Sequence, residues 1–293
     1  MIRVISQVKQ FDDRVAAITG AGSGIGRGLA QALVARGAHV ALSDVDEVGL
    51  AATVASCEQQ GASLVTSARV DVADRAAVFD WAGRVRADHG QVNLVVNNAG
   101  VALAASVEEM AIADFEWLMG VNFWGVVHGT QAFLPHLEAS GAGHVVNISS
   151  VFGLVSIPMQ SAYNAAKFGV RGFSDALRIE LEIARSCVSV TTVHPGGVKT
   201  NIARNARLSD ALAAVDEGGA DEFERMARTT PEQAAEQILR AVARNRRRAL
   251  IGPDARVFDL VSRLPAAVSQ RLLVAAGRRR QAATPLDRAG MPH

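Results

Sequence analysis

The sequence predicts a doubly wound α/β fold, in which one parallel sheet of seven strands is covered by helices on both faces. Short β-branched runs alternate with longer segments of helical length and apolar spacing from about residue 14 to residue 252, the pattern of a parallel sheet with crossover helices. Hydrophobic residues make up 49% of the 293 residues, so a large core is available. Length alone permits one domain or two. Because nothing interrupts the alternation, we expect a single domain with appendages.

Each element follows from its local pattern of apolar residues. The strands are predicted at 14–19, 39–44, 63–70, 92–97, 143–149, 188–194 and 248–252. The helices are predicted at 24–36, 47–60, 74–89, 113–139, 161–185 and 231–245. Thr230 and Pro231 form a typical helix start, with Thr as the N-cap and Pro in the first turn.

Three parts of the chain can be distinguished around this pattern. Residues 1–12 form an N-terminal extension, residues 13–252 the α/β domain, and residues 253–293 an arginine-rich extension. Within the domain, 200–230 is polar and contains glycines. Such a segment beside strand ends is either a lid over the substrate or a plain surface excursion, and the sequence leaves both possibilities open.

The C-terminal extension has apolar residues near helical spacing, interrupted by Pro265, among several arginines. It could cover the substrate pocket, lie on a membrane surface through 254–293, or pack on its own domain or another subunit. Because arginines are abundant throughout the chain, we favour packing over membrane contact. The apolar positions are Val257, Leu260, Val261, Leu264, Val268 and Leu272.

Composition excludes several classes of function. The 30 basic residues are balanced by 29 acidic ones, so no overall field favours nucleic acid as a partner. Cys57 and Cys187 are far apart and the histidines lack metal-ligand spacing, so no metal site is predicted. Neither a signal-peptide core nor a long apolar span is apparent. We therefore expect a cytoplasmic protein.

A glycine-rich turn lies between the first strand and the first helix, in the sequence Thr19-Gly20-Ala21-Gly22-Ser23-Gly24-Ile25-Gly26. Glycines there allow a tight turn and a close approach of the backbone to a pyrophosphate, and the helix N-terminus supplies N–H donors. The position between strand and helix makes a dinucleotide site a better explanation than ordinary turn glycines.

Asp44 ends the second strand, 24 residues after Gly20. A carboxylate at this point can accept from the 2′-hydroxyl of the adenosine ribose and would repel a 2′-phosphate. Its neighbours Ser23 and Val45 offer no compensating cation, so NAD is favoured over NADP. The alternative is that Asp44 caps the helix that begins near Asp46.

Tyr163 is the only tyrosine, and Lys167, one of three lysines beside 27 arginines, follows it by four residues. On a helix this spacing places both side chains on one face, where an ammonium is expected to lower the phenol's pKa towards neutrality. Such a phenol could act as a general acid or base. For an isolated Tyr and Lys at this spacing, chance would be the better explanation. Whether the pair has a chemical role therefore depends on the motifs around it.

These and further motifs resemble the short-chain dehydrogenase/reductase family from about Arg14 to Gly252. The glycine turn is similar to TGxxxGxG, Asn97 to Gly100 to the NNAG loop, and Tyr163 to Lys167 to YxxxK. Ser150 precedes Tyr163 by 13 residues, which selects it over Ser149. His194 to Thr200 is similar to the PGxVxT segment that holds the nicotinamide carboxamide.

The resemblance implies a Rossmann fold and a role for each matched residue. Tyr163 would exchange a proton with the substrate oxygen, Lys167 would lower the phenol's pKa and hold the nicotinamide ribose, and Ser150 would bind the same oxygen. Asn122 would keep a water that links Lys167 to solvent. The implied catalytic residues are Asn122, Ser150, Tyr163 and Lys167. The implied cofactor-binding residues are Gly20, Ser23, Gly24, Ile25, Gly26, Asp44, Asp71, Val72, Asn98, Ala99, Gly100, Tyr163, Lys167, Pro195, Gly196, Val198 and Thr200.

The expected function is an NAD-dependent oxidoreductase that interconverts a secondary alcohol and a ketone. The segments expected to line the pocket, 101–103, 151–159 and Ile202, are largely apolar, which favours a lipophilic substrate. The alternatives are an NADP-dependent carbonyl or 3-oxoacyl reductase and a non-catalytic nucleotide-binding sensor or scaffold. The long helices at 113–139 and 161–185 resemble those through which family members form homodimers and homotetramers.

Overall fold

The computed structural model describes residues 11–209, 212 and 219–283. Its main sheet has seven parallel strands in the order β3-β2-β1-β4-β6-β7-β9. This confirms the predicted fold class, and each strand matches its predicted run to within two residues at either end. The strands are β1 (Val15–Thr19), β2 (His39–Asp44), β3 (Val65–Arg69), β4 (Leu94–Asn97), β6 (Gly143–Ile148), β7 (Val188–Pro195) and β9 (Arg248–Ile251).

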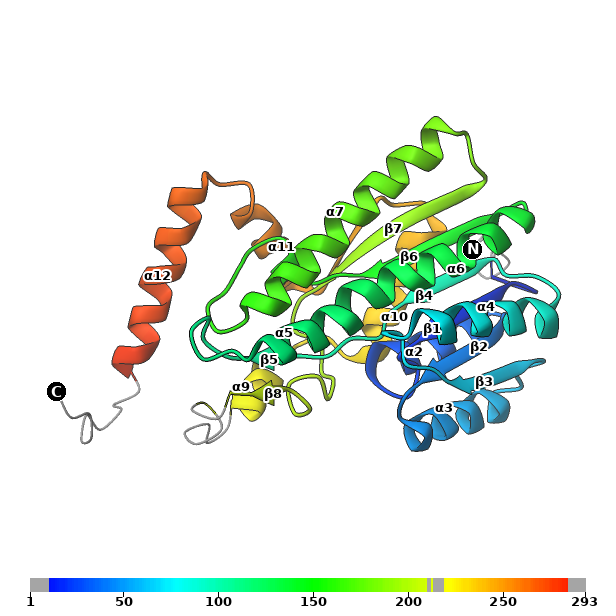
Figure 1. The fold of residues 1–293 in the computed structure, drawn as a ribbon, viewed down its shortest axis with the longest axis horizontal. Helices are drawn as coiled ribbons and strands as arrows, with labels where there is room; N and C mark the ends of the chain where they lie inside the picture. The colour runs from blue at the N-terminus through cyan, green and yellow to red at the C-terminus, as the bar shows by residue number, and fades with distance from the viewer. Residues whose placement is uncertain (1–10, 210–211, 213–218, 284–293) are drawn as a thin grey trace, which may run out of the picture.

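Helices cover both faces of this sheet (Figure 1). One face carries α2 (Gly24–Val34), α3 (Glu47–Gln59) and α10 (Pro231–Ala243), and the other carries α4 (Arg75–His89), α6 (Gly125–Ala139) and α7 (Ser161–Ile183). Alternate strand residues point to opposite faces, so Ile18 of β1 belongs to the first core cluster and Ala17 to the second.

The order of the strands reverses direction between β1 and β4. The chain builds β1, β2 and β3 in one direction and then returns to place β4 on the other side of β1. The crossovers that follow β1 and β4 therefore diverge, and open α/β sheets bind ligands at such a point, beyond the carboxyl ends of the strands.

The helix predicted over 113–139 is divided into three parts, so that prediction was wrong in detail. A π-helical turn, Gly120–Trp124 (η1), separates α5 (Ile112–Met119) from α6. A π turn holds one more residue per hydrogen-bonded ring than an α turn and often marks a functional position. Here it contains Asn122, which is fully buried.

The segment 200–230 is attached to the loop after β4. A short strand, β8 (Arg207–Leu208), pairs with β5 (Leu103–Ala104), and the Arg207 guanidinium binds Asp114 at 2.8 Å and lies 3.6 Å above the Trp117 ring. The helix α9 (Gly219–Met226) follows, whereas residues 210–211 and 213–218 lie outside the described part of the chain.

The C-terminal extension consists of two helices that separate at Pro265. The first, α11 (Pro253–Val261), packs on β9 through buried Asp259, which binds Arg248 at 3.2 Å and Arg263 at 2.7 Å. The second, α12 (Ala266–Ala283), stands apart from the sheet and its covering helices (Figure 1). Residues 284–293 and 1–10 lie outside the described residues, while Phe11, the next residue, is buried in the core.

Across the described ranges, no helix combines the length and the apolar character that crossing a membrane requires.

Candidate active site

The predicted site residues gather where the strands end. Thr19, Asp44 and Asn97 are the last residues of β1, β2 and β4, and Ser150 and Pro195 lie at the ends of β6 and β7. Because the strands are parallel, these ends meet at one edge of the sheet.

The glycine turn is closed by contacts that leave no room for side chains. Gly20 has φ of +65°, and a Cβ added to it would lie 2.7 Å from the Ala99 Cα. A Cβ added to Gly26 would collide with the Gly20 carbonyl oxygen. The Asn98 side chain donates to the carbonyls of Thr19 at 2.9 Å and Gly20 at 3.0 Å. The turn is therefore as tight as pyrophosphate binding at a helix N-terminus requires.

The start of α2 fits an anionic ligand. Ser23 is the N-cap residue, and its side chain does not bond to the helix N–H groups. These donors and the positive end of the helix dipole suit a pyrophosphate. The Ile25 side chain packs against the core, so only its backbone can contribute.

Thr19 joins β1 to the loop after β4 and was missed by the sequence analysis as a site residue. Its hydroxyl oxygen accepts from the N–H groups of Asn98 at 3.0 Å and Ala99 at 3.1 Å. The only sequence signal was its place before Gly20. These hydrogen bonds fix the distance between the glycine turn and the loop after β4. Both segments match family motifs that hold the cofactor.

Asp44 holds the glycine turn through both carboxylate oxygens. Oδ2 accepts from the Gly22 N–H at 2.7 Å and Oδ1 from the Asp46 N–H at 3.0 Å. The side chain that caps α3 is that of Asp46, which accepts from the Gly49 N–H. Asp44 is therefore not the helix cap, and its partly exposed carboxylate retains lone pairs for a further donor.

Arg27 is a cation near this turn that the sequence analysis missed. Its guanidinium donates to the Thr53 hydroxyl at 2.9 Å and to the carbonyls of Gly22 and Gly49. These contacts tie the glycine turn to α3. The guanidinium is thus bonded to neutral protein oxygens in the loop.

Asp71 and Val72 follow β3 and differ in exposure. Asp71 is exposed and accepts from the Ala73 N–H at 2.9 Å, while Val72 is buried against Gly125. The Val72 carbonyl accepts from His128 Nδ1 at 3.1 Å. This carbonyl contact fixes the loop in which both residues lie.

Tyr163 and Lys167 lie on one face of α7, as predicted. The Lys167 Nζ atom is 5.5 Å from the centre of the Tyr163 ring and donates to the Ile148 carbonyl at 3.1 Å. Lys167 is only 3% exposed, whereas Tyr163 is partly buried. The pair is therefore enclosed, with the tyrosine nearer to solvent.

The pKa of Tyr163 moves in the direction opposite to our expectation. Burial raises the pKa of Tyr163 to about 12, and the hydrogen bond with Ser150 offsets only part of this. Burial also lowers the pKa of Lys167 to about 8. The expected lowering of the phenol's pKa was wrong because loss of hydration opposes the charged form of both groups. Tyr163 is therefore a protonated donor at neutral pH.

Gly100, Asn122 and Lys167 converge behind this pair. A Cβ added to Gly100 would lie 3.3 Å from Asn122 Oδ1 and 3.6 Å from Lys167 Nζ. Asn122 also bonds to both backbone groups of Val101, accepting from N–H and donating to the carbonyl, each at 2.8 Å. The π turn thereby locks the loop after β4 against α7.

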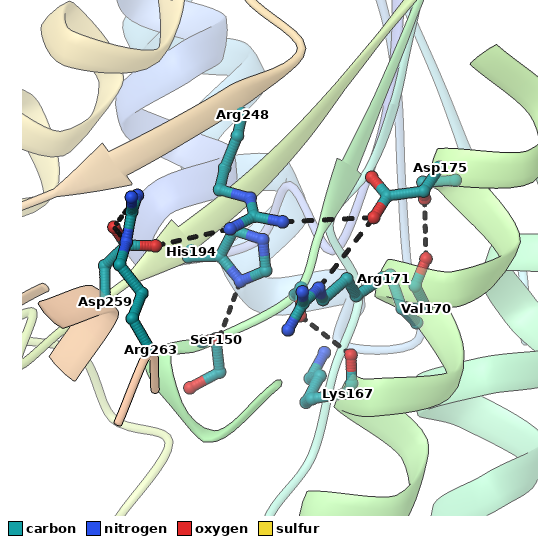
Figure 2. Close-up of polar contacts among 11 residues, drawn as sticks. Ser150, Lys167, Val170, Arg171, Asp175, His194, Arg248, Asp259 and Arg263 are labelled. Carbon is teal, nitrogen blue, oxygen red and sulfur yellow. Dashed lines mark hydrogen bonds and ion pairs between the residues drawn. The ribbon is translucent and has the colours of Figure 1, made fainter. Parts of the chain in front are cut away.

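The two adjacent serines after β6 have different roles. The Ser149 hydroxyl donates to the Lys167 carbonyl at 2.9 Å, whereas the Ser150 hydroxyl accepts from the Phe152 N–H at 3.1 Å and is close enough to Tyr163 to lower the pKa of the phenol. The Ser150 carbonyl accepts from His194 Nδ1 at 2.9 Å (Figure 2). Burial lowers the pKa of His194 to about 4, so the ring is neutral at pH 7. It therefore bonds to this carbonyl without adding a charge.

The segment after β7 reaches back to the glycine turn. A methyl carbon of Thr200 would lie 3.0 Å from a Cβ added to Gly24. Gly196 donates its N–H to the Ile251 carbonyl at 3.0 Å, and Gly197 donates its N–H to Asp254 Oδ2 at 2.6 Å. Val198 is buried in the core, so its backbone is what can face a ligand.

Aromatic side chains connect α11 to the tyrosine. Phe152 packs edge-to-face with Tyr163 at 6.3 Å and with Phe258 of α11 at 6.1 Å between ring centres. From the sequence, residues 253–261 were expected to lie in an extension outside the domain. These contacts place α11 beside the site.

The matches to known proteins agree with this architecture. The short chain dehydrogenase family model matches residues 14–211, and SadH of Mycobacterium tuberculosis is 51% identical over 270 residues, which cover 92% of this chain and 96% of SadH. A short chain dehydrogenase/reductase of Burkholderia phymatum, solved in complex with NAD, is 30% identical with a TM-score of 0.74, over 96% of this chain and 99% of that one. Levodione reductase is 29% identical with a TM-score of 0.71, over 79% of this chain and 91% of that one. By sequence, motif order and fold, this chain belongs to the short-chain dehydrogenase/reductase family of NAD(P)-binding oxidoreductases.

Proposed function

We propose that this protein interconverts a secondary alcohol and a ketone with NAD, with Tyr163 as the general acid and base. The observation that carries the proposal is the convergence of Ser150, Tyr163 and Lys167 at the strand ends, beside a glycine turn that fits a dinucleotide. The ketone-reducing activity in the name of levodione reductase, a structural relative, supports the same class of reaction.

In this mechanism the protein's own residues handle the substrate oxygen. In ketone reduction, the Tyr163 hydroxyl donates its proton to the carbonyl oxygen while the Ser150 hydroxyl holds that oxygen in place. Bound NAD supplies the hydride chemistry at the substrate carbon. Lys167 is a donor beside the tyrosine and would hold the nicotinamide ribose. In alcohol oxidation, the phenolate of Tyr163 takes the proton instead.

Asn122 supports this machinery by fixing the loop that faces Lys167. Both polar atoms of its side chain are bonded to Val101. Asn122 Oδ1 keeps a second lone pair and Nδ2 a second hydrogen, so the side chain could also hold the proposed water that links Lys167 to solvent.

Apolar residues around Tyr163 favour a lipophilic substrate. Tyr163 packs against a third apolar cluster, and Leu154 and Val155 on the loop after Ser150 are buried. Apolar pockets select apolar ligands by removing their surface from water. We propose that the described residues of 200–230 cover this pocket, since β8 pairs with β5 beside the same cluster. The cluster consists of Leu103, Leu118, Ala162 and Ala166, packed by Val101, Met110, Phe115, Trp117, Met119 and Phe123.

Replacing Tyr163 tests the acid and base role. Tyr163→Phe keeps the ring but removes the hydroxyl that exchanges the proton. We expect kcat to fall by about 10²- to 10⁴-fold, the usual contribution of general acid catalysis, with NADH binding unchanged. Steady-state kinetics and NADH titration of both proteins measure this. A kcat near that of the unchanged protein would refute the assignment.

Replacing Asp44 tests the cofactor preference. In the proposed complex the carboxylate accepts from the ribose 2′-hydroxyl and repels a 2′-phosphate, so Asp44→Ala should reduce the preference for NAD over NADP by roughly 10- to 100-fold, the effect of one hydrogen bond to a charged group. The ratio of kcat/KM values for the two cofactors measures the change. Asp46→Ala, which removes only the cap of α3, is the matched control. An unchanged ratio in Asp44→Ala would count against the proposed NAD preference.

The raised pKa of Tyr163 predicts opposite pH behaviour in the two directions. Below a pKa of about 12 the phenol is mostly protonated, so reduction should change little between pH 6 and pH 8. Oxidation needs the phenolate, whose fraction rises with pH by up to about tenfold per unit. Measuring kcat in both directions over this range checks the sign. Oxidation that slows as pH rises would contradict the assignment.

We propose that the protein forms a homo-oligomer in the cytoplasm, through the outer face of α7. Phe168, Ile179 and Ile183 recur at helical spacing and are exposed by 38%, 55% and 78%. Gly172, between the first two, has open space at its Cβ position. An exposed apolar stripe of this kind is typical of a subunit contact.

Light scattering of the purified protein tests this proposal. The unchanged protein should be a dimer or tetramer, and Ile179→Glu should shift it towards the monomer because a charge would be buried in the contact. Val257→Glu, on the exposed side of α11, is the matched control. A monomeric unchanged protein would rule the oligomer out.

A further inference from the structure

Asp254 lies in the first turn of α11, outside every motif that the chain shares with its family, yet it contacts the segment after β7. Its Oδ2 atom accepts from the Gly197 N–H at 2.6 Å. The two residues are 57 positions apart in the sequence. A hydrogen bond between a backbone N–H and a carboxylate is among the stronger ones in proteins, so this contact can set the position of the segment.

Two glycines are shaped around the same carboxylate. A Cβ added to Gly196 would collide with all three carboxyl atoms of Asp254, and a Cβ added to Gly252 would lie 2.7 Å from Oδ1. Gly252 also has φ of +89°, a conformation that other residues rarely adopt. The backbone therefore approaches the carboxylate from two sides, which leaves Asp254 little freedom to move.

The helix that carries Asp254 is itself anchored. Asp259, one turn further on, is buried between Arg248 of β9 and Arg263 (Figure 2). Arg248 also lies 3.9 Å from Asp175 of α7. Since β9 pairs with β7, these contacts fix α11 relative to the strand that leads into the segment.

The other anchors of this segment are backbone groups. Gly196 donates to the Ile251 carbonyl at 3.0 Å, and Lys199 donates to the Thr229 carbonyl at 2.9 Å. Replacing Asp254 should therefore alter the position of the segment after β7 while the residues of that segment stay unchanged.

We propose that Asp254 is a positioning residue for the nicotinamide end of the dinucleotide, acting through the backbone of Gly196 and Gly197. This rests on the proposed function, in which the segment 195–200 holds the nicotinamide side. The carboxylate touches neither substrate nor reacting atoms. It orients the backbone that would hold the nicotinamide carboxamide.

The test compares binding of NADH with binding of ADP-ribose, which lacks the nicotinamide. Asp254→Ala should weaken NADH binding about tenfold, as expected for loss of one charge-assisted hydrogen bond, and should leave ADP-ribose binding nearly unchanged. Asp254→Asn retains an acceptor oxygen and should recover most of the NADH affinity. Calorimetric titration gives both affinities, and thermal unfolding shows whether each variant is folded. If Asp254→Ala does not fold, Asp254→Ser, whose hydroxyl is too short to reach Gly197, carries the same expectation.

A second comparison asks whether the Asp254 carboxylate is the group that excludes a side chain at Gly196. Gly196→Ala should weaken NADH binding in the unchanged protein, and it should cost less in the Asp254→Ala background because the colliding group is gone. Arg256→Ala, exposed on the same helix, is the matched control and should change neither affinity.

The outcomes separate this inference from the proposed function. Equal weakening of NADH and ADP-ribose, or no weakening of either, would overturn the positioning role of Asp254. Failure of the unchanged protein to bind NADH or NADPH would instead count against the proposed function. Additive effects of Gly196→Ala and Asp254→Ala would also overturn the inference.

Discussion

The close approach between the start of α2 and the end of β1 is the constraint on which the site depends. A side chain at Gly26 would collide with the Gly20 carbonyl, and Asn98 bridges that carbonyl to the loop after β4. Because Thr19 bonds to the backbone of the same loop, the glycine turn and the loop can only move together. The loops after β1 and β4 are thereby fixed relative to each other, as preorganised binding requires.

The groups assigned to proton transfer are enclosed by apolar residues, and this enclosure determines their chemistry. Lys167 is almost fully buried and Tyr163 packs on an apolar cluster. Loss of hydration disfavours a charge on either group, which explains why the pKa of the tyrosine rises and that of the lysine falls. The hydrogen bond from Lys167 to the Ile148 carbonyl compensates part of this loss. The site therefore keeps its proton donor protonated near neutral pH.

The C-terminal part of the chain divides into a helix that belongs to the site and a helix that does not. In α11, Asp254 reaches the segment after β7 and Phe258 reaches the aromatic ring next to Tyr163. In α12, Val268 and Leu272 remain exposed. Pro265 lies between the two helices and cannot donate the N–H that a continuous helix needs. A single sequence segment thus supplies both a wall of the site and an outward extension.

The sequence by itself determined the seven strands of the main sheet and pointed to residues that gather at the ends of those strands. Strands such as 188–194 were predictable because a β-branched run acts locally, and the glycine turn, Asp44 and the pair Tyr163 and Lys167 were predictable because their spacing is local too. The π turn at Asn122, the contact of Asp254 with Gly197 and the raised pKa of Tyr163 were not predictable. Each depends on groups far apart in the chain, and both desolvation and long-range hydrogen bonding are set by packing. Spacing in a sequence determines which side chains share a face, whereas only the tertiary structure decides what surrounds that face.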